Sequence, residues 1–232
     1  ADQTTLQEGH SGTTAFTFTV TRGGNTTGVG SVDWALSSAA AVAGDFTTAD
    51  GLGTNSGLPS GTVNFADGEA NRTITVDVVG DVTVESDEAF TITLSNAVGG
   101  QIQTATAGST IVNDDATIAI TAASAVLDEG NSGTTAFTFT ITRTGALDDA
   151  ETVDYAITGS GANPANGADF GGSLPSGTLT LPAGQASVTL TINVSGDLAG
   201  EPDEGFTVTL SNPSGGVTIT TDTATGTIQA DD

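Results

Sequence analysis

The sequence predicts an all-β protein built from two antiparallel β-sandwiches in tandem, each with about seven strands. Three observations support this fold class: a long internal repeat, apolar residues that alternate with threonine, and a composition with 32 glycines and no cysteine or methionine. The length of 232 residues suits two domains of roughly 100–150 residues, each able to bury a core. No stretch of the chain shows a convincing helical period.

The internal repeat defines the two modules. The stretch from Glu8 to Arg22 returns almost unchanged from Glu129 to Arg143, a shift of 129 − 8 = 121 residues. Each copy also ends in the same Asp-Asp pair. Repetition over such a length marks duplicated structural units. We therefore expect one sandwich over residues 1–115 and a second over residues 116–232.

The alternation of apolar residues with threonine places strands along each copy. Between Phe16 and Val20, apolar side chains fall on one face and threonines on the other, as in a strand with one buried face. Threonine suits the outer face because its β-branched side chain fits a pleated surface. The first copy shows the pattern in residues 16–20, 32–36, 63–65, 74–78 and 90–94, and the second in residues 137–141, 153–157, 179–181, 188–194 and 206–210.

The two copies differ at their starts. The second copy begins with Thr117-Ile-Ala-Ile-Thr121, which we interpret as a first strand, whereas the first copy has only seven residues ahead of Glu8. We therefore expect the first strand of the first module to be short or missing. A sandwich that lacks an edge strand exposes unpaired backbone, which another chain can complete by strand addition. Two interpretations stay open: the chain is a piece of a longer array, or Ala1 is a mature terminus and subunits join head to tail.

The charge of the chain excludes several classes of partner. The sequence has 3 lysines and arginines against 28 aspartates and glutamates, a formal net charge of −25. A chain with so few cations cannot neutralise phosphates, so we expect no nucleic-acid partner and no anionic membrane partner. No apolar run has the length of a membrane span, so we expect no direct membrane insertion. The lack of cysteine and methionine argues against thiol chemistry and soft-metal sites.

The acidic residues point instead to a hard divalent cation. Many of them recur at equivalent places in the two copies, next to strand ends and turns. In a seven-stranded sandwich these places can all lie at one pole, where carboxylates raise one another's pKa unless a cation lies between them. Ca²⁺, which takes about 6–8 oxygen ligands, resolves this conflict better than Mg²⁺ does. The alternative, for any single acid, is that it only solvates a loop.

The same residues carry a resemblance to the Calx-beta family. Both copies show Glu-Gly, Asp-Phe, Leu-Pro-Ser-Gly, Glu-x-Asp-Glu-x-Phe and a terminal Asp-Asp in the same order, over nearly the whole chain. The resemblance implies immunoglobulin-like sandwiches, each with a Ca²⁺ site at the pole near the end of its last strand. The ligands that it implies are Glu8, Asp45, Asp81, Glu85, Glu88, Asp114 and Asp115 in the first copy, and Glu129, Asp169, Asp197, Glu201, Glu204, Asp231 and Asp232 in the second. Family members that bind several ions have longer runs of aspartate, so we expect one or two ions per site.

No enzyme activity is predicted. His10 is the only histidine and its counterpart is Asn131, so a Ser-His-Asp triad has little support and we interpret His10 as a loop residue. Paired carboxylates can hydrolyse glycosides, but the aromatic residues Trp34 and Tyr155 fall at core positions rather than on a sugar-binding surface.

Three functions remain, and the first is our leading hypothesis. It is a calcium-binding structural or adhesive protein at an extracellular or cell-surface location of a bacterium, whose partners are further copies of itself in a head-to-tail fibre or neighbouring modules of a longer array. The second is a Ca²⁺-sensing regulatory module of a larger transporter or receptor. The third is an accessory segment of a large secreted adhesin or enzyme.

Overall fold

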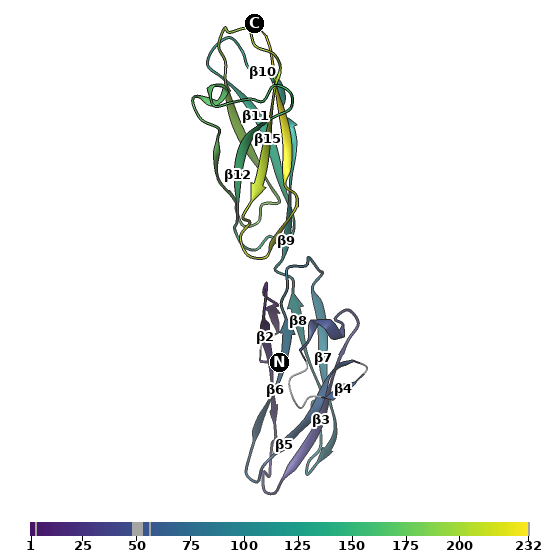
Figure 1. Cartoon of the computed structure of the whole chain (residues 1–232). Helices are drawn as coiled ribbons and strands as arrows, with labels where there is room; N and C mark the ends of the chain where they lie inside the picture. Colours follow the sequence, from purple (N-terminus) through teal and green to yellow (C-terminus); the bar gives the residue numbers. More distant parts are fainter. Residues whose placement is uncertain (3, 48–52, 56, 232) are drawn as a thin grey trace. The chain divides into compact units, whose positions relative to one another are not determined.

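The computed structural model of the chain describes residues 1–2, 4–47, 53–55 and 57–231 (Figure 1). Contacts divide the chain into two compact units, Ala1–Asp115 and Ala116–Asp232. Within the described residues the regular structure is strand, apart from two single-turn 3₁₀ helices, η1 (Ala43–Asp45) and η2 (Ala168–Phe170). The all-β prediction is therefore confirmed. Neither of these short helical turns has the length and apolar character that a membrane-crossing helix needs.

The first unit is a sandwich of two sheets. Its strands are β1 (Thr5–Gln7), β2 (Thr13–Thr21), β3 (Gly30–Ser38), β4 (Gly53–Asn55), β5 (Leu58–Phe65), β6 (Asn71–Val79), β7 (Glu88–Val98) and β8 (Thr106–Val112). One sheet has the order β1-β8-β7-β3-β5-β4, and the other pairs β2 with β6. The β1–β8 pairing is parallel, whereas the other pairings are antiparallel.

The second unit repeats this sandwich with more strands in one sheet. Its strands are β9 (Ala116–Ser124), β10 (Val126–Asp128), β11 (Thr134–Gly145), β12 (Glu151–Ser160), β13 (Ser176–Leu181), β14 (Ser187–Ser195), β15 (Glu204–Ser211), β16 (Val217–Thr221) and β17 (Thr223–Gln229). The sheet orders are β10-β17-β15-β12-β13 and β14-β11-β9-β16. Two neighbouring pairs, β10–β17 and β9–β16, are parallel.

The cores are built by the apolar faces that the alternation predicts. In the first unit Phe90 is 2% exposed and meets Phe16, Phe18 and Phe46 edge to face, with ring centroids 5.4, 5.9 and 5.7 Å away. Edge-to-face pairs bring the positive ring edge against the negative ring face. The second unit repeats the arrangement around Phe206. The duplicated sequence therefore folds into duplicated packing.

The glycine of the Leu-Pro-Ser-Gly motif makes room for a large ring. Trp34, on β3, is 4% exposed, and a Cβ at Gly61 would lie 3.0 Å from its indole nitrogen. Tyr155 lies in the same way over Gly177, where a Cβ would lie 3.2 Å from the phenol oxygen. Trp34 is thus a core residue as predicted, whereas Tyr155 is only half-buried.

The two units differ in the strand that opens each sandwich. In the second unit β9 lies between β11 and β16, but the described residues ahead of β1 in the first unit form no strand. Asp2, ahead of β1, bonds to β2: its backbone N–H donates to the Thr17 carbonyl at 3.0 Å, and its side chain accepts from the Thr19 N–H at 3.2 Å. This confirms the prediction that the first strand is short or missing.

Candidate metal sites

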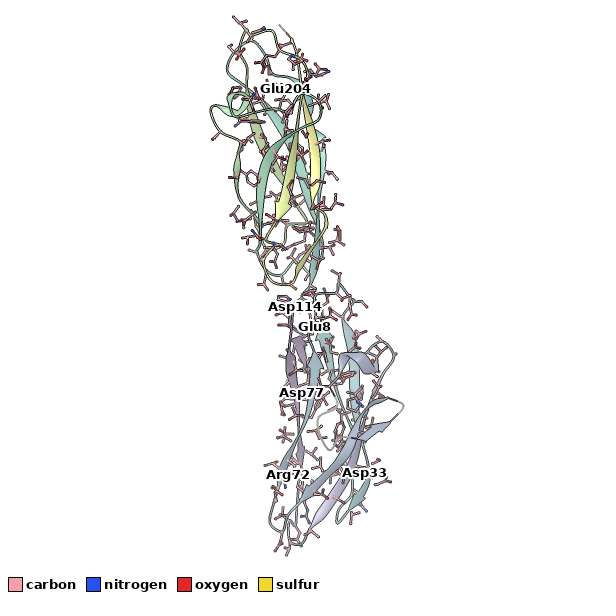
Figure 2. The ribbon with its side chains drawn as sticks, in the orientation of Figure 1. Glu8, Asp33, Arg72, Asp77, Asp114 and Glu204 are labelled. Atoms are coloured by element: carbon pink, nitrogen blue, oxygen red, sulfur yellow. The ribbon has the colours of Figure 1, made fainter. Side chains whose placement is uncertain are left out.

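The predicted ligands of each unit come from segments that meet at one end of its sandwich. In the first unit, Figure 2 shows Glu8 and Asp114 together at that end, while Asp33 and Arg72 lie toward the other end. The first unit supplies Glu8 after β1, Asp45 in η1, Asp81 and Glu85 between β6 and β7, Glu88 at the start of β7, and Asp114 and Asp115 after β8. The second unit supplies Glu129 after β10, Asp169 in η2, Asp197 and Glu201 between β14 and β15, Glu204 at the start of β15, and Asp231 after β17. Asp232 lies outside the described residues.

One group of three carboxylates occurs in each unit at equivalent positions. Asp45, Glu85 and Glu88 offer oxygen atoms that all lie within 4.8 Å of one another. The second unit brings Asp169, Glu201 and Glu204 together within the same distance. Like charges this close repel strongly, and a divalent cation between them would turn the repulsion into attraction.

The first unit has another group, formed by His10, Asp114 and Asp115. The His10 Nδ1 atom lies 2.8 Å from Asp115 Oδ1 and 3.7 Å from Asp114 Oδ2. The three side chains offer ligand atoms within 4.8 Å of one another. His10 is therefore more than the loop residue that the sequence suggested, because its ring contacts two predicted ligands.

Each unit buries a carboxylate oxygen that has no hydrogen-bond partner in the structure. Asp115 is 0% exposed, and its Oδ2 is unpaired. In the second unit the unpaired oxygen is Glu204 Oε2. A buried polar atom without a partner is costly, and a bound cation would supply the missing partner. The all-oxygen carboxylate set and its unpaired oxygens fit a hard divalent ion such as Ca²⁺.

The pKa values in the first unit show how closely its acids interact. Burial, and then the charges of Glu85, Asp115, Asp81 and Asp114, raises the pKa of Glu8 from 4.5 to about 7. The Glu8 side chain thus interacts with acids from two other segments, the β6–β7 connection and the residues after β8. Burial, the charge of Asp45 and a hydrogen bond to it raise the pKa of Glu88 to about 7.

Glu85 interacts electrostatically with acids from both groups of the first unit. Burial raises its pKa, and the charges of Asp45, Asp81 and Asp115 add to the rise. Asp45 belongs to the group of three carboxylates that has an equivalent in the second unit, whereas Asp115 belongs to the group that contains His10. The seven predicted ligands of this unit therefore form one electrostatic cluster.

The second unit shows the same coupling among its described acids. Burial raises the pKa of Glu129, followed by the charges of Glu201, Asp197, Asp169 and Asp231. The pKa of Glu204 rises to about 7 through burial, the charge of Asp169 and a hydrogen bond to it. The structure thus brings together the predicted ligands of this unit as far as Asp231.

A glycine to which the sequence assigned no role allows the loops of the site to meet. A Cβ at Gly80 would overlap the carbonyl group of Gly9, and the Gly80 N–H donates to the Gly12 carbonyl at 3.1 Å. Gly196 approaches Gly130 in the same way in the second unit. Any side chain here would push the Glu-Gly loop away from the loop that carries Asp81. The Gly-Asp dipeptide that recurs in both copies was the available signal.

Two recurring aspartates outside the predicted ligand set hold the site together. Asp87 Oδ1 accepts a hydrogen bond from the Asn113 N–H at 3.2 Å, and Asp203 Oδ1 accepts from the Ala230 N–H at 3.0 Å. Each bond fastens the loop before β7 or β15 to the end of the last strand. In the first unit Asn113 Oδ1 also accepts from the Glu85 N–H at 3.0 Å, and the second unit has Ala230 at this place.

A second recurring pair of acids outside the predicted ligand set lies away from the site. Asp33 accepts hydrogen bonds from Thr62 Oγ1 at 2.7 Å and from Asn96 Nδ2 at 3.0 Å. These bonds lower its pKa. Asp154 has the same two kinds of partner. Both acids serve the outer face of the sheet, which matches their predicted place opposite the core.

Comparison with known proteins identifies the domain type. The Calx-beta domain profile matches residues 9–121 and 113–232. Among solved structures, CBD12 from CALX1.2 is 18% identical over 97% of this chain and 96% of that one, with a TM-score of 0.44. CBD12 of CALX1.1, described as a calcium binding domain, is 19% identical over 91% of this chain and 78% of that one, with a TM-score of 0.43. The apo form of the Calx CBD1 domain is 25% identical over 51% of this chain and 100% of that one, with a TM-score of 0.42. Because two profile matches together cover nearly the whole sequence, as its recurring motifs suggested, this chain belongs to the Calx-beta domain family.

Proposed function

We propose that each unit binds Ca²⁺ at its carboxylate cluster, and that the chain is a Ca²⁺-stabilised structural or adhesive part of an extracellular or cell-surface protein. The observation that carries the proposal is the unpaired, fully buried oxygen of Asp115 within a cluster of acids. A protein gains little from burying such an oxygen unless a cation binds it. Family membership supports the calcium binding, and the sites offer acids for binding rather than a nucleophile and base for catalysis.

The residues that would hold the ion are the predicted ligands. They are Glu8, Asp45, Asp81, Glu85, Glu88, Asp114 and Asp115 in the first unit, and Glu129, Asp169, Asp197, Glu201, Glu204 and Asp231 in the second, with Asp232 as a further candidate from the sequence. Bound Ca²⁺ supplies positive charge among them and so favours their ionised forms. The protein residues place oxygens from separate loops at one end of the sandwich, so the ion would join these loops.

The composition supports an extracellular location. The chain has 28 acidic residues, 3 basic residues and no cysteine, which suits a calcium-rich surrounding in which the acids are neutralised by bound ions. Its partners in this proposal are further copies of the chain, joined head to tail, or neighbouring modules of a longer array. Sedimentation velocity in millimolar Ca²⁺ tests this: concentration-dependent growth supports head-to-tail joining, and a monomer at every concentration contradicts it.

Thermal unfolding in EDTA and across a Ca²⁺ titration tests the binding proposal. A ligand at 100 times its Kd stabilises the native state by about 2.7 kcal/mol. We expect Glu88→Gln to weaken this stabilisation in the first unit and Glu204→Gln in the second, since each replaces a cluster carboxylate. Asp33→Asn is the matched control, because Asp33 lies on the outer face of the sheet. An unchanged melt in millimolar Ca²⁺ would overturn the proposal.

A regulatory module of a larger protein is the second candidate, and a difference between the two sites favours it. His10 contacts Asp115 at 2.8 Å in the first unit, and Asn113 holds the loop of Glu85 there. Two sites with different surroundings can fill at different Ca²⁺ concentrations and so give a graded response. Calorimetric titration decides: two affinities more than about tenfold apart favour the sensor, and a single affinity favours the structural role.

A further inference from the structure

The second unit contains the single Asn-Gly dipeptide of the sequence, Asn166-Gly167. It directly precedes η2, which carries the predicted ligand Asp169. The backbone nitrogen that follows an asparagine can attack the amide carbon of its side chain and close a succinimide ring. Glycine hinders this attack least, because it has no Cβ beside the nitrogen. The dipeptide therefore places a reactive pair of residues next to the second site.

Two hydrogen bonds fix the conformation of Asn166. Its Oδ1 atom accepts from the Ala168 N–H at 3.0 Å, so the side chain turns back along its own backbone, past the Gly167 nitrogen. The Asn166 N–H donates to Asp169 Oδ2 at 2.5 Å and so holds the carboxylate of the predicted ligand. The residue that carries the reactive amide is thus bonded directly to the calcium site.

The surroundings of the dipeptide favour the attack on the amide. Asn166 is exposed to solvent, and within the described part of the chain the Gly167 N–H donates no hydrogen bond. As the nitrogen attacks, negative charge develops on Asn166 Oδ1. The Ala168 N–H already lies in place to stabilise that charge, in the way that a backbone donor of an oxyanion hole does. The fold therefore supplies an accessible nucleophile and a stabilised oxyanion.

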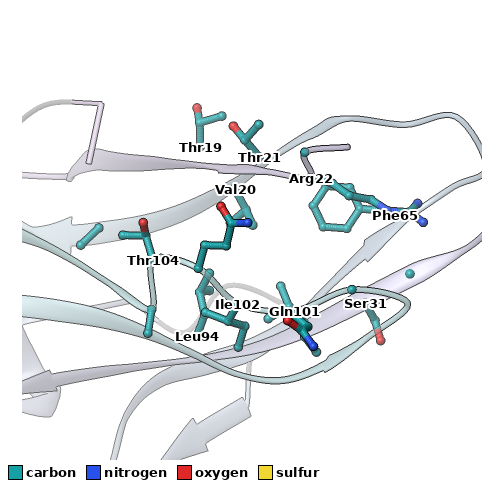
Figure 3. A pocket seen from close by; sticks show the side chains of 18 of the residues that line it. Thr19, Val20, Thr21, Arg22, Ser31, Phe65, Leu94, Gln101, Ile102 and Thr104 are labelled. Atoms are coloured by element: carbon teal, nitrogen blue, oxygen red, sulfur yellow. The ribbon is translucent and has the colours of Figure 1, made fainter. Parts of the chain in front are cut away.

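An Asp-Gly pair in the first unit, Asp67-Gly68, can close the same ring with loss of water, but its groups are engaged elsewhere. Asp67 Oδ1 accepts from the Gly28 N–H at 2.6 Å, and the Gly68 N–H donates to the Thr26 carbonyl at 2.9 Å. That carbonyl also accepts from the side chain of Arg22 at 3.1 Å, which lines the cavity of about 880 Å³ drawn in Figure 3. Bonds to a distant loop therefore hinder ring closure at Asp67.

We propose that Asn166-Gly167 is a site of spontaneous deamidation, which weakens the second calcium site with time and leaves the first unchanged. The Gly167 nitrogen bonds to Asn166 Cγ and gives its proton to solvent, while the side-chain nitrogen takes up a proton and leaves as ammonia. Water then opens the succinimide at either of its carbonyl carbons and gives aspartate or isoaspartate. The net reaction consumes one water and releases one ammonia, without oxidation or reduction.

The isoaspartate product changes the backbone that positions Asp169. It routes the chain through the former side chain and so adds a methylene between the Asn166 N–H and η2, which breaks the fit of the bond to Asp169 Oδ2. The first unit has the same bond, from the Val42 N–H to Asp45 Oδ2 at 2.5 Å, but Val42 and Ala43 stand there in place of the dipeptide. The expected loss is therefore confined to the second site. This consequence rests on the proposed calcium binding by Asp169.

Mass spectrometry of the full chain tests the chemical step. The folded protein and a sample unfolded in urea are incubated at mildly alkaline pH, and the peptide that contains Asn166 is followed by its mass and by enzymatic methylation of isoaspartate. We expect the folded chain to react at Asn166 at least as fast as the unfolded chain. Asn166→Gln should remove the reaction, because the longer side chain closes a larger ring slowly. A folded chain that keeps Asn166 intact while the unfolded chain reacts would overturn the proposal.

A gain of reaction in the first unit is the matched test. Val42 is 61% exposed, so Val42→Asn together with Ala43→Gly rebuilds the dipeptide beside Asp45 without disturbing the core. We expect this variant to deamidate in the first unit as well, and the fluorescence of Trp34 shows whether that unit stays folded. A folded variant that shows no reaction at residue 42 would contradict the role given to this loop geometry.

Calorimetric titration with Ca²⁺ of fresh and incubated protein tests the consequence. We expect the binding event of the second site to be lost in proportion to the deamidated fraction, and the incubated Asn166→Gln protein to show no such loss. Deamidation at Asn166 with unchanged Ca²⁺ binding would overturn the effect on the site. A fresh protein that binds no Ca²⁺ would overturn the proposed function and the effect on the site with it, while the mass measurement would still decide whether Asn166 reacts.

Discussion

Replacing one buried acid should stabilise the calcium-free protein. Glu8 is 5% exposed and its pKa rises from 4.5 to about 7, so the folded protein resists its ionisation. One pH unit of difference between folded and unfolded pKa is worth about 1.4 kcal/mol. At pH 8 in EDTA, Glu8→Gln should therefore raise the free energy of unfolding of the first unit by about 3 kcal/mol. At pH 5, where Glu8 is largely protonated in the folded state, the gain should fall below about 1 kcal/mol.

Urea unfolding followed by Trp34 fluorescence measures this effect in the first unit alone, because the chain has a single tryptophan. Glu129→Gln is the control: it makes the equivalent change in the second unit and should leave the Trp34 transition in place. The Glu8→Gln variant should also gain less than the unaltered chain from added Ca²⁺. A Glu8→Gln protein that is no more stable at pH 8 in EDTA would refute the view that buried like charges strain the empty site.

Three further outcomes are expected. In EDTA the free energy of unfolding should fall as the pH rises from about 4.5 to about 7, because Glu8 and Glu88 keep protons in the folded state that the unfolded chain has lost. Urea titrations at several pH values measure this dependence. Saturating Ca²⁺ should make the free energy of unfolding depend less on pH. Phe206→Ala should lower the free energy of unfolding of the second unit by about 3–5 kcal/mol, as measured by near-ultraviolet circular dichroism in urea. Gly80→Ala should weaken Ca²⁺ binding at the first site and leave binding at the second site unchanged, as measured by calorimetric titration. Gly100→Ala is the control, because a Cβ there meets nothing within 4 Å, and it should leave Ca²⁺ binding at both sites unaltered.

The fold was predictable because local pattern and packing agree in this chain. The alternation from Phe16 to Val20 survives as a strand whose aromatic residues lie in the core. The short strands were not foreseen: β4, β10 and β16 have 3, 3 and 5 residues. Strands of this length contain too few residues for a period to show, and they exist because a neighbouring strand offers a backbone to bind.

The candidate site was predictable in part, because the acids that recur at equivalent positions of a duplicated sequence can be recognised by comparing the two copies. No such recurrence marks His10, whose counterpart is an asparagine, and the contact of its ring with Asp115 depends on the fold. The role of Gly80 was missed for a related reason: this glycine lets two loops distant in sequence touch, and no local spacing reveals that. Which acids would be buried also depends on loop packing rather than on sequence order.

The single histidine gives the first site a natural spectroscopic label. His10 lies 2.8 Å from Asp115, and no other imidazole is present in the sequence. In D₂O, where the exchangeable amide protons are replaced, its ring Hε1 proton would therefore give the only imidazole Hε1 resonance of the unlabelled protein. This signal would follow the filling of one site while the other fills unseen, so the order in which two duplicated sites take up an ion becomes readable without isotope labelling of the protein and without mutations.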